Sequence, residues 1–211
     1  MEKHIITISR EFGSGGRTIG KLVAEHLGIP CYDAELLQKL AAESGFDENY
    51  VREAGEYTPG GFLASAFTDR SFGLTNEDLL WKLQYRIIRE LAEKESCVIV
   101  GKCADYVLKG KPNVVSIYIE APRAFCVNRT MENMGVTKEV ANATIERTDK
   151  FRADYYEYYT HGNYWTNPVN YDMTLNSERV GVQNCVKTIE QYLIIKGLIT
   201  PDMIHPAGEL K

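Results

Sequence analysis

Long apolar runs are absent from this sequence of 211 residues. No run approaches the ~20 residues that a membrane-spanning helix needs, so we expect no membrane partner. The first four residues lead directly into a β-branched run, which predicts no signal peptide and a cytoplasmic location. Repeats, low-complexity tracts and a convincing linker are also missing, and this favours a single domain.

Metal-binding and disulfide patterns are lacking as well. The cysteines are odd in number and widely spaced, with no C-x-x-C pair, and this predicts reduced, buried side chains: Cys31, Cys97, Cys103, Cys126 and Cys185. The four histidines show no metal-ligand spacing, so we expect no zinc site. Positive charge is scarce too, because 24 Lys and Arg face 29 Asp and Glu, for a net charge of -5. This balance argues against a nucleic acid polymer as partner.

What the chain does have is a glycine-rich turn between a buried strand and an amphipathic helix. Residues 5–8 are β-branched and predict the strand, and residues 13–16 read GSGG. Apolar side chains at positions 19, 22, 23 and 27 predict the helix. Glycines let backbone N–H groups approach phosphate oxygens, and a helix N-terminus adds partial positive charge. The sequence therefore predicts a phosphate-binding loop here, against the alternative of a tight turn that binds no ligand.

Two registers relate this turn to the phosphate-loop pattern G-x-x-x-x-G-K-[ST]. In the first, Gly16, Arg17 and Thr18 stand for its last three residues, so that Arg17 replaces the lysine. In the second, Gly16 stands at the lysine position and Thr18 still supplies a hydroxyl. We favour the first, because a cation directly before a hydroxyl suits a phosphate with magnesium, and arginine binds phosphate oxygens in bidentate fashion.

Further apolar patterns predict an alternation of strands and helices, and hence an α/β fold with a parallel sheet covered on both faces. Strands are expected at 29–33, 97–100, 114–119 and 171–176, and helices at 34–43, 76–94, 123–134, 137–159 and 181–195. We expect the helix at 137–159 to be interrupted. Residues 43–76 are irregular and rich in glycine, which predicts a mobile region, and residues 198–211 are expected to form a C-terminal tail.

Several polar and aromatic residues have two interpretations. Asp33 either caps the next helix or is a ligand-binding group at the end of a parallel strand. The cations Arg129, Arg147, Lys150 and Arg152 form either a solvated helix face or, in a phosphotransferase, a lid over the transferred group. For the aromatic residues within 155–165, core packing or a homodimer interface is favoured over base stacking.

Five stretches in this order resemble the cytidylate kinase-like family of P-loop proteins. They read ITISREFGSGGRTIG, IPCYD, VIVGKCADYVL, VVSIYIEAP and IERTDKFR, and YDMTLNS with its following helix is similar to the family as well. The resemblance spans residues 5–193 and implies a three-layer P-loop kinase core with a parallel sheet and helical lid regions. Residues 1–197 would form one domain, with an acceptor-side mobile region at 43–76 and a lid region at 137–165.

The resemblance also implies an activity and its residues. It implies phosphoryl transfer from ATP with Mg2+ to a nucleoside monophosphate such as CMP. The donor phosphates would lie on Gly13, Ser14, Gly15, Gly16, Arg17 and Thr18, with Thr18 as magnesium ligand. Arg17, Arg147 and Arg152 would be the catalytic cations. Asp33, Arg70, Lys102, Asp105 and Arg129 would bind the acceptor.

The sequence departs from the family pattern at places that matter for catalysis. Val100 stands where the family has a carboxylate behind the magnesium, and Asp105, Glu11 or Glu120 would have to replace it. Phe151 and Ala153 interrupt the charged run of the lid. Two alternatives therefore stay open: a nucleotide-binding regulatory protein with little catalysis, and a P-loop kinase with a non-nucleotide acceptor.

Overall fold

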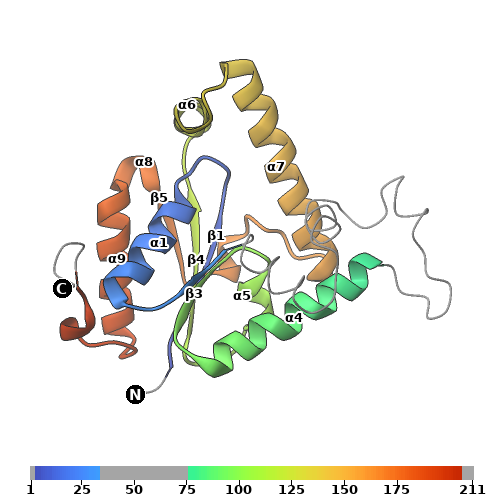
Figure 1. Ribbon diagram of the computed structural model, residues 1–211. Helices are drawn as coiled ribbons and strands as arrows, with labels where there is room; N and C mark the ends of the chain where they lie inside the picture. The colour runs from blue at the N-terminus through green and yellow to red at the C-terminus, as the bar shows by residue number, and fades with distance from the viewer. Residues whose placement is uncertain (1–2, 34–75, 206–211) are drawn as a thin grey trace.

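The computed structural model describes residues 3–33 and 76–205, and its strands form one parallel sheet (Figure 1). The strands are β1 (Ile5–Arg10), β2 (Cys31–Tyr32), β3 (Cys97–Val100), β4 (Val114–Glu120) and β5 (Met173–Asn176). Their order across the sheet is β2-β3-β1-β4-β5. The first strand of the chain is therefore the central one, paired with β3 on one side and β4 on the other.

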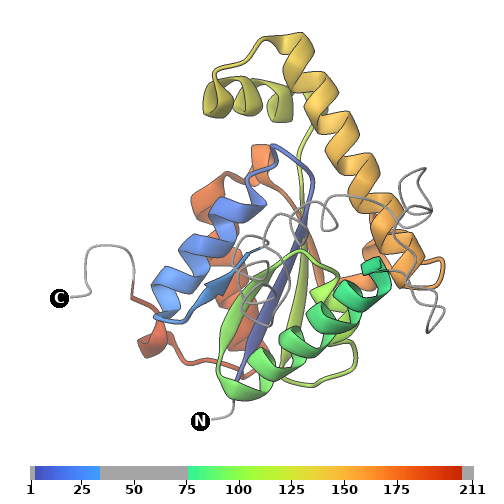
Figure 2. The ribbon, with the colours of Figure 1, turned by 45° about the vertical axis from the view of Figure 1, so that its right-hand side comes forward.

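Helices cover both faces of this sheet, as the alternation of elements predicted. On one face lie α1 (Gly16–Leu27) and α9 (Val182–Ile195), and on the other lie α4 (Asn76–Lys94) and α5 (Ala104–Val107). The short helix α8 (Ser177–Val180) follows β5. Two further helices are α6 (Arg123–Met134) and α7 (Lys138–Tyr159). Helix α6 and the start of α7 stand beyond the carboxyl ends of the strands, and the end of α7 lies beside α4 (Figure 2). Two 3-10 turns, Pro168–Asn170 and Pro201–Met203, complete the described elements.

The alternation of side chains along the strands builds two cores. Ile5 packs with α4 and α5, whereas its neighbour Ile6 packs with α1 and α9. The same alternation separates Ile99 from Val98 on β3, because successive side chains of a strand point to opposite faces. Such continuous apolar strands are typical of a parallel sheet buried on both sides.

The prediction of buried cysteines is confirmed for four of the five. All five are free, and all except the half-buried Cys31 are buried.

The long helix α7 corrects one prediction. Residues 138–159 form a single uninterrupted helix that begins after Thr137, whose hydroxyl accepts the N–H of Val140. The interruption expected in the helix at 137–159 is not there. The carboxylate of Asp149 accepts the backbone N–H of Phe12 instead of competing for the backbone of its own helix, so it does not disturb the helix.

Most of the aromatic residues at the end of α7 and just after it pack inside the chain. Tyr155, Tyr156, Tyr159 and Trp165 belong to one buried cluster, and the Tyr159 ring stacks on Trp81 of α4 with centroids 4.4 Å apart. This confirms core packing for these four side chains. Tyr158 and Tyr164 are exposed.

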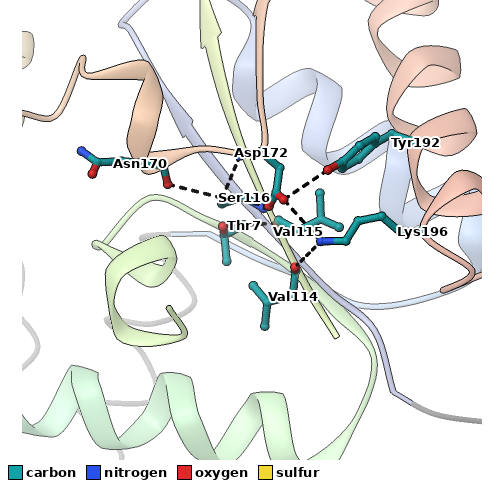
Figure 3. Close-up of polar contacts among 8 residues, drawn as sticks. All are labelled: Thr7, Val114, Val115, Ser116, Asn170, Asp172, Tyr192 and Lys196. Atoms are coloured by element: carbon teal, nitrogen blue, oxygen red, sulfur yellow. Dashed lines mark hydrogen bonds and ion pairs between the residues drawn. The ribbon is translucent and has the colours of Figure 1, made fainter. Parts of the chain in front are cut away.

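A polar cluster ties α9 to the sheet at the start of β5 (Figure 3). The carboxylate of Asp172 accepts hydrogen bonds from the N–H and hydroxyl of Ser116 at 2.8 and 3.1 Å. It also accepts from the Tyr192 hydroxyl at 3.2 Å and the Lys196 ammonium at 3.3 Å. Burial alone would raise the pKa of Asp172, but the Ser116 N–H and the Lys196 charge favour the ionised form, so the pKa lies below its ordinary value.

The described part of the expected tail packs against the core. Ile199 is buried, with Leu198, Met203 and Ile204 beside it, and the N–H of His205 bonds to the carbonyl of His26 on α1. The predicted helix at 34–43, almost all of the region 43–76 and the candidate Arg70 lie outside the described residues. In the described ranges, none of the helices combines the length and apolar character that crossing a membrane requires.

Candidate active site

The glycine-rich turn connects β1 to α1 with two left-handed residues. Gly13 has φ 80° and Gly15 has φ 88°, a region that glycine adopts without a Cβ penalty. Gly15 is the residue before the helix, so α1 begins at Gly16 with its free N–H groups at the turn. The buried Ser14 braces the turn, because its hydroxyl donates to the carbonyl of Glu11 at 2.9 Å and its own carbonyl accepts from Ser177 of α8. The result is a fixed loop whose amides suit an anion.

Helix α6 lies directly on this turn. A Cβ added at Gly13 would lie 2.6 Å from the carbonyl oxygen of Cys126 and 2.9 Å from the Thr130 hydroxyl. The Arg129 guanidinium lies beside Gly15, with its Cζ 3.3 Å from the place that a Cβ would take, and its Nη2 donates to the Thr18 hydroxyl at 3.1 Å. The predicted acceptor-binding Arg129 is thus next to the loop predicted to bind the donor, and it contacts the predicted magnesium ligand.

Helix α7 contacts the other side of the turn through Arg152. Its Nη1 donates to the carbonyl of Arg10 and to the carboxylate of Asp149, both at 3.1 Å. Asp149 in turn accepts the N–H of Phe12 at 2.8 Å, and the Arg152 guanidinium lies over the Phe12 ring. One ion pair therefore fixes α7 to the segment just before the glycines.

Arg147 is not at this contact. It lies on the exposed part of α7, five residues before Arg152, and a continuous helix of 3.6 residues per turn cannot direct both side chains to one point. The structure therefore brings Arg152 to the glycine turn and leaves Arg147 at the surface.

Arg17 points from α1 toward the end of β2. Its guanidinium pairs with the carboxylate of Asp33, with Nη2 and Oδ2 2.6 Å apart. The Arg17 side chain is 48% exposed and that of Asp33 13% exposed. These two candidates, predicted for different roles, thus form one ion pair.

The turn after β3 carries the next two candidates. Gly101, Lys102 and Cys103 are all left-handed, with φ 79°, 58° and 55°. Left-handed residues other than glycine store backbone strain, and such strain is often found at functional sites. The Lys102 ammonium lies 5.8 Å from the centre of the Tyr155 ring.

Asp105 follows this turn and is 6% exposed. It accepts hydrogen bonds from the hydroxyls of Ser9, at 3.3 Å, and Tyr156, at 2.7 Å. Burial raises its pKa. The carboxylate that was predicted to face an acceptor is thus engaged between β1, α5 and α7.

Two residues at the site escaped the sequence reasoning, Arg10 and Asp149. Arg10 ends β1, and its side chain crosses the glycine turn toward Gly101. Burial, and then the charge of Arg152, lower the pKa of Arg10 to about 9. The signal that could have found Arg10 is its place at the carboxyl end of the central strand, the edge at which open α/β sheets bind ligands. No signal in the sequence singles out Asp149, because its partner Phe12 lies 137 residues away.

The described residues contain no group of three or more His, Cys, Asp or Glu side chains that could hold a metal ion. Magnesium bound with nucleotide phosphates needs few protein ligands, so the hydroxyl of Thr18 at the start of α1 fits such an ion. Of the carboxylates considered for its support, Glu11 accepts the N–H of Ala121 at 3.3 Å, and burial raises its pKa.

A parallel sheet in this strand order, with a glycine turn after its central strand and two helices above it, defines the fold of a P-loop kinase. Shikimate kinase from Bacteroides thetaiotaomicron has this fold, with a TM-score of 0.52 at 17% identity over 90% of this chain and 98% of that chain. The chain belongs to the Cytidylate kinase-like family, whose profile matches residues 5–179.

Individual relatives are similar over most of their length. Cytidylate kinase from Methanosarcina mazei is 29% identical over 177 residues, which are 82% of this chain and 87% of the relative. An uncharacterized protein from Eubacterium ventriosum is 30% identical, with a TM-score of 0.71 over 91% of this chain and 99% of that one. Family and fold together define a phosphotransferase of the nucleotide-kinase type.

Proposed function

We propose that this protein transfers a phosphoryl group from ATP with Mg2+ to a small acceptor, a nucleoside monophosphate such as CMP. The observation that carries the proposal is a gathering of arginines from four elements at one glycine turn. Arg10 comes from β1, Arg17 from α1, Arg129 from α6 and Arg152 from α7. In a chain with net charge -5, this gathering is suited to a polyanion. The relatives named cytidylate kinase support CMP as the acceptor.

The role proposed for each residue on the donor side follows from where it lies relative to the glycine turn. The amides of residues 13–18 would hold the donor phosphates, and Arg129 beside Gly15 would add a charge-assisted contact. Arg152 would stabilise charge on the transferred group, since its guanidinium lies against the segment before the glycines. Phosphoryl transfer relies on positioning and electrostatics, so no nucleophilic side chain is required.

Fewer contacts support the residues proposed to bind the acceptor. Lys102 lies at the strained turn after β3, and Asp33 lies at the end of β2 beside Arg17. Both positions are at the carboxyl edge of the sheet, next to the glycine turn. Asp105, buried behind that edge, would act by holding Ser9 and Tyr156 in place. Arg147 and Arg70 stay predictions of the family resemblance.

Magnesium would be held by the Thr18 hydroxyl together with phosphate oxygens of the donor. When bound, the ion neutralises charge on the phosphates during transfer. Thr18 now accepts a hydrogen bond from Arg129, so we propose that Arg129 exchanges this hydroxyl for a phosphate oxygen when nucleotide binds.

The test is ADP release by the purified protein with ATP and Mg2+, measured against a panel of acceptors. The panel contains CMP, UMP, AMP, GMP and small hydroxylated acids and sugars, with chelator as the negative control. Turnover that depends on a nucleoside monophosphate supports the proposal. Turnover with only a non-nucleotide acceptor would leave a kinase and overturn the nucleotide assignment. ATP binding with no acceptor-dependent turnover would favour the regulatory protein.

A further inference from the structure

The side chain of Arg10 lies across two glycines. A Cβ added at Gly16 would lie 2.5 Å from the Cβ of Arg10 and 2.9 Å from its Cγ. A Cβ added at Gly101, after β3, would collide with the Nη1 atom of Arg10. The Cβ and Cγ atoms of Arg10 therefore occupy the space beside Gly16, and its guanidinium occupies the space beside Gly101. Position 16 has to be glycine while Arg10 is there, because the Cβ of Arg10 is fixed by the backbone. At position 101 the guanidinium end of Arg10 could move, and it is the left-handed φ of 79° that favours glycine.

Within the described part of the chain, the guanidinium of Arg10 has no direct partner. Across residues 3–33 and 76–205, no hydrogen bond or ion pair reaches its guanidinium. Two carboxylates act on the charge of Arg10, but each is paired with another arginine. Asp33 is paired with Arg17, and Asp149 is paired with Arg152. Burial disfavours the charged form, yet an arginine stays protonated at neutral pH. A partly buried cation with five free N–H donors is costly unless an anion completes it.

The phosphate-loop pattern explains why a cation is at this position. With Gly16 at the lysine position of G-x-x-x-x-G-K-[ST], the first glycine of the pattern falls on Arg10. A glycine and a cation have then changed places relative to the pattern. The contact between Arg10 and Gly16 accounts for the exchange, because the arginine stem fills the space in which a lysine stem at position 16 would begin.

We propose that Arg10 is the phosphate-binding cation of this loop, in the role that lysine has in the usual pattern. The proposal rests on the proposed function, since its ligand is the polyphosphate of the donor nucleotide. The guanidinium would bind the phosphate chain between the glycine turn and the turn after β3. Arg17, whose guanidinium pairs with Asp33, would then not have the lysine role.

The first experiment uses tripolyphosphate, which carries the phosphates without the nucleoside. Its affinity is measured by calorimetry for the full-length protein, for Arg10→Met and for Arg86→Met. Arg86 is an exposed arginine of α4 paired with Glu90, so this control removes the same charge away from the site. We expect Arg10→Met to bind at least about tenfold more weakly, because a charge-assisted contact is lost, and Arg86→Met to bind as the unaltered protein does.

The second experiment exchanges the two residues. Gly16→Lys alone should lower the melting temperature, because its Cβ meets Arg10. The double variant Arg10→Gly with Gly16→Lys restores the first glycine and the lysine of the pattern, and it should regain both melting temperature and tripolyphosphate affinity over Gly16→Lys. Such a recovery would show that the two substitutions are energetically coupled, because the effects of independent substitutions add.

The outcomes separate the two proposals. Unchanged tripolyphosphate affinity in Arg10→Met, no binding by the unaltered protein, or a double variant no better than Gly16→Lys would each overturn the role of Arg10. Binding that depends on Arg10 in a protein that releases no ADP with any acceptor would uphold Arg10 and overturn the proposed function.

Discussion

Two arginines on α7 differ in what they contact, although the family resemblance implies the same catalytic role for both. Arg152 bonds to the carbonyl of Arg10, whereas Arg147 is exposed. We expect Arg152→Ala to lower kcat by about a hundredfold, because a guanidinium near the transferred group acts most strongly in the transition state. Arg147→Ala should have a smaller effect. Turnover and melting temperature are measured on both variants.

The comparison has two contrary outcomes. Equal losses of kcat would mean that both arginines reach the transferred group, as the family resemblance implies. A fall in melting temperature without a fall in kcat would reduce Arg152 to a structural ion pair with Asp149.

At single positions, the sequence predicted the glycine turn better than the side chains around it. Glycines at 13 and 15 are required by positive φ, which is a local property that a pattern can show. The side chains of Arg17, Arg129 and Arg152 contact partners that are 16, 111 and 142 residues away in the sequence. The local sequence does not determine those contacts. Arg10 was not predicted as a site residue, because the favoured register placed Arg17 at the lysine position of the pattern.

Among the elements, the packing of α6 on the glycine turn leads to a test of stability. Gly13 and Gly110 have nearly the same backbone, φ 80° and 83°, but only Gly13 has atoms within 4 Å of an added Cβ. Gly110→Ala should cost about 1–2 kcal/mol for the left-handed conformation alone. Gly13→Ala should cost at least about 1 kcal/mol more, because its Cβ meets the carbonyl of Cys126. Denaturant unfolding measures both.

Equal costs for the two variants would show that α6 moves away from the turn without penalty. In that case, ATP affinity in Gly13→Ala tells whether the contact matters for binding.

The elements themselves were largely predictable. The helix at 76–94 and the strand at 97–100 have the expected bounds, because each is a strong periodic or continuous apolar pattern. The short helices α5 and α8 were not predicted, since four residues are too few to show a helical period. The break expected in α7 was wrong because the side chain of Asp149 found a partner in Phe12.

For the molecule as a whole, Asp172 should make stability depend on pH. Its pKa is lower in the folded protein than in the unfolded chain, so its contribution is present above the ordinary carboxyl pKa of about 4 and is lost as the pH falls further. Asp172→Asn should cost about 1–3 kcal/mol at pH 7, since the charged acceptor of Ser116, Tyr192 and Lys196 is removed.

The same variant should also lose less stability than the unaltered protein between pH 5 and pH 3. Denaturant unfolding at both pH values checks this, with Glu90→Gln on exposed α4 as the control. An unchanged pH dependence in Asp172→Asn would show that other carboxylates dominate acid unfolding.

The central place of β1 has a consequence for how the chain is made. Ile5 pairs with Cys97 and with Val114, so the central strand leaves the ribosome about 90 residues before its first neighbour. At ~5–20 residues per second, this strand waits roughly 5–20 seconds with both edges open. Before β3 and β4 arrive, α1 can shield one face of it through Ile19 and Val23, and α4 later covers the other face. The amphipathic helix that follows the glycine turn is therefore also the first cover of a nascent strand that would otherwise be prone to aggregate.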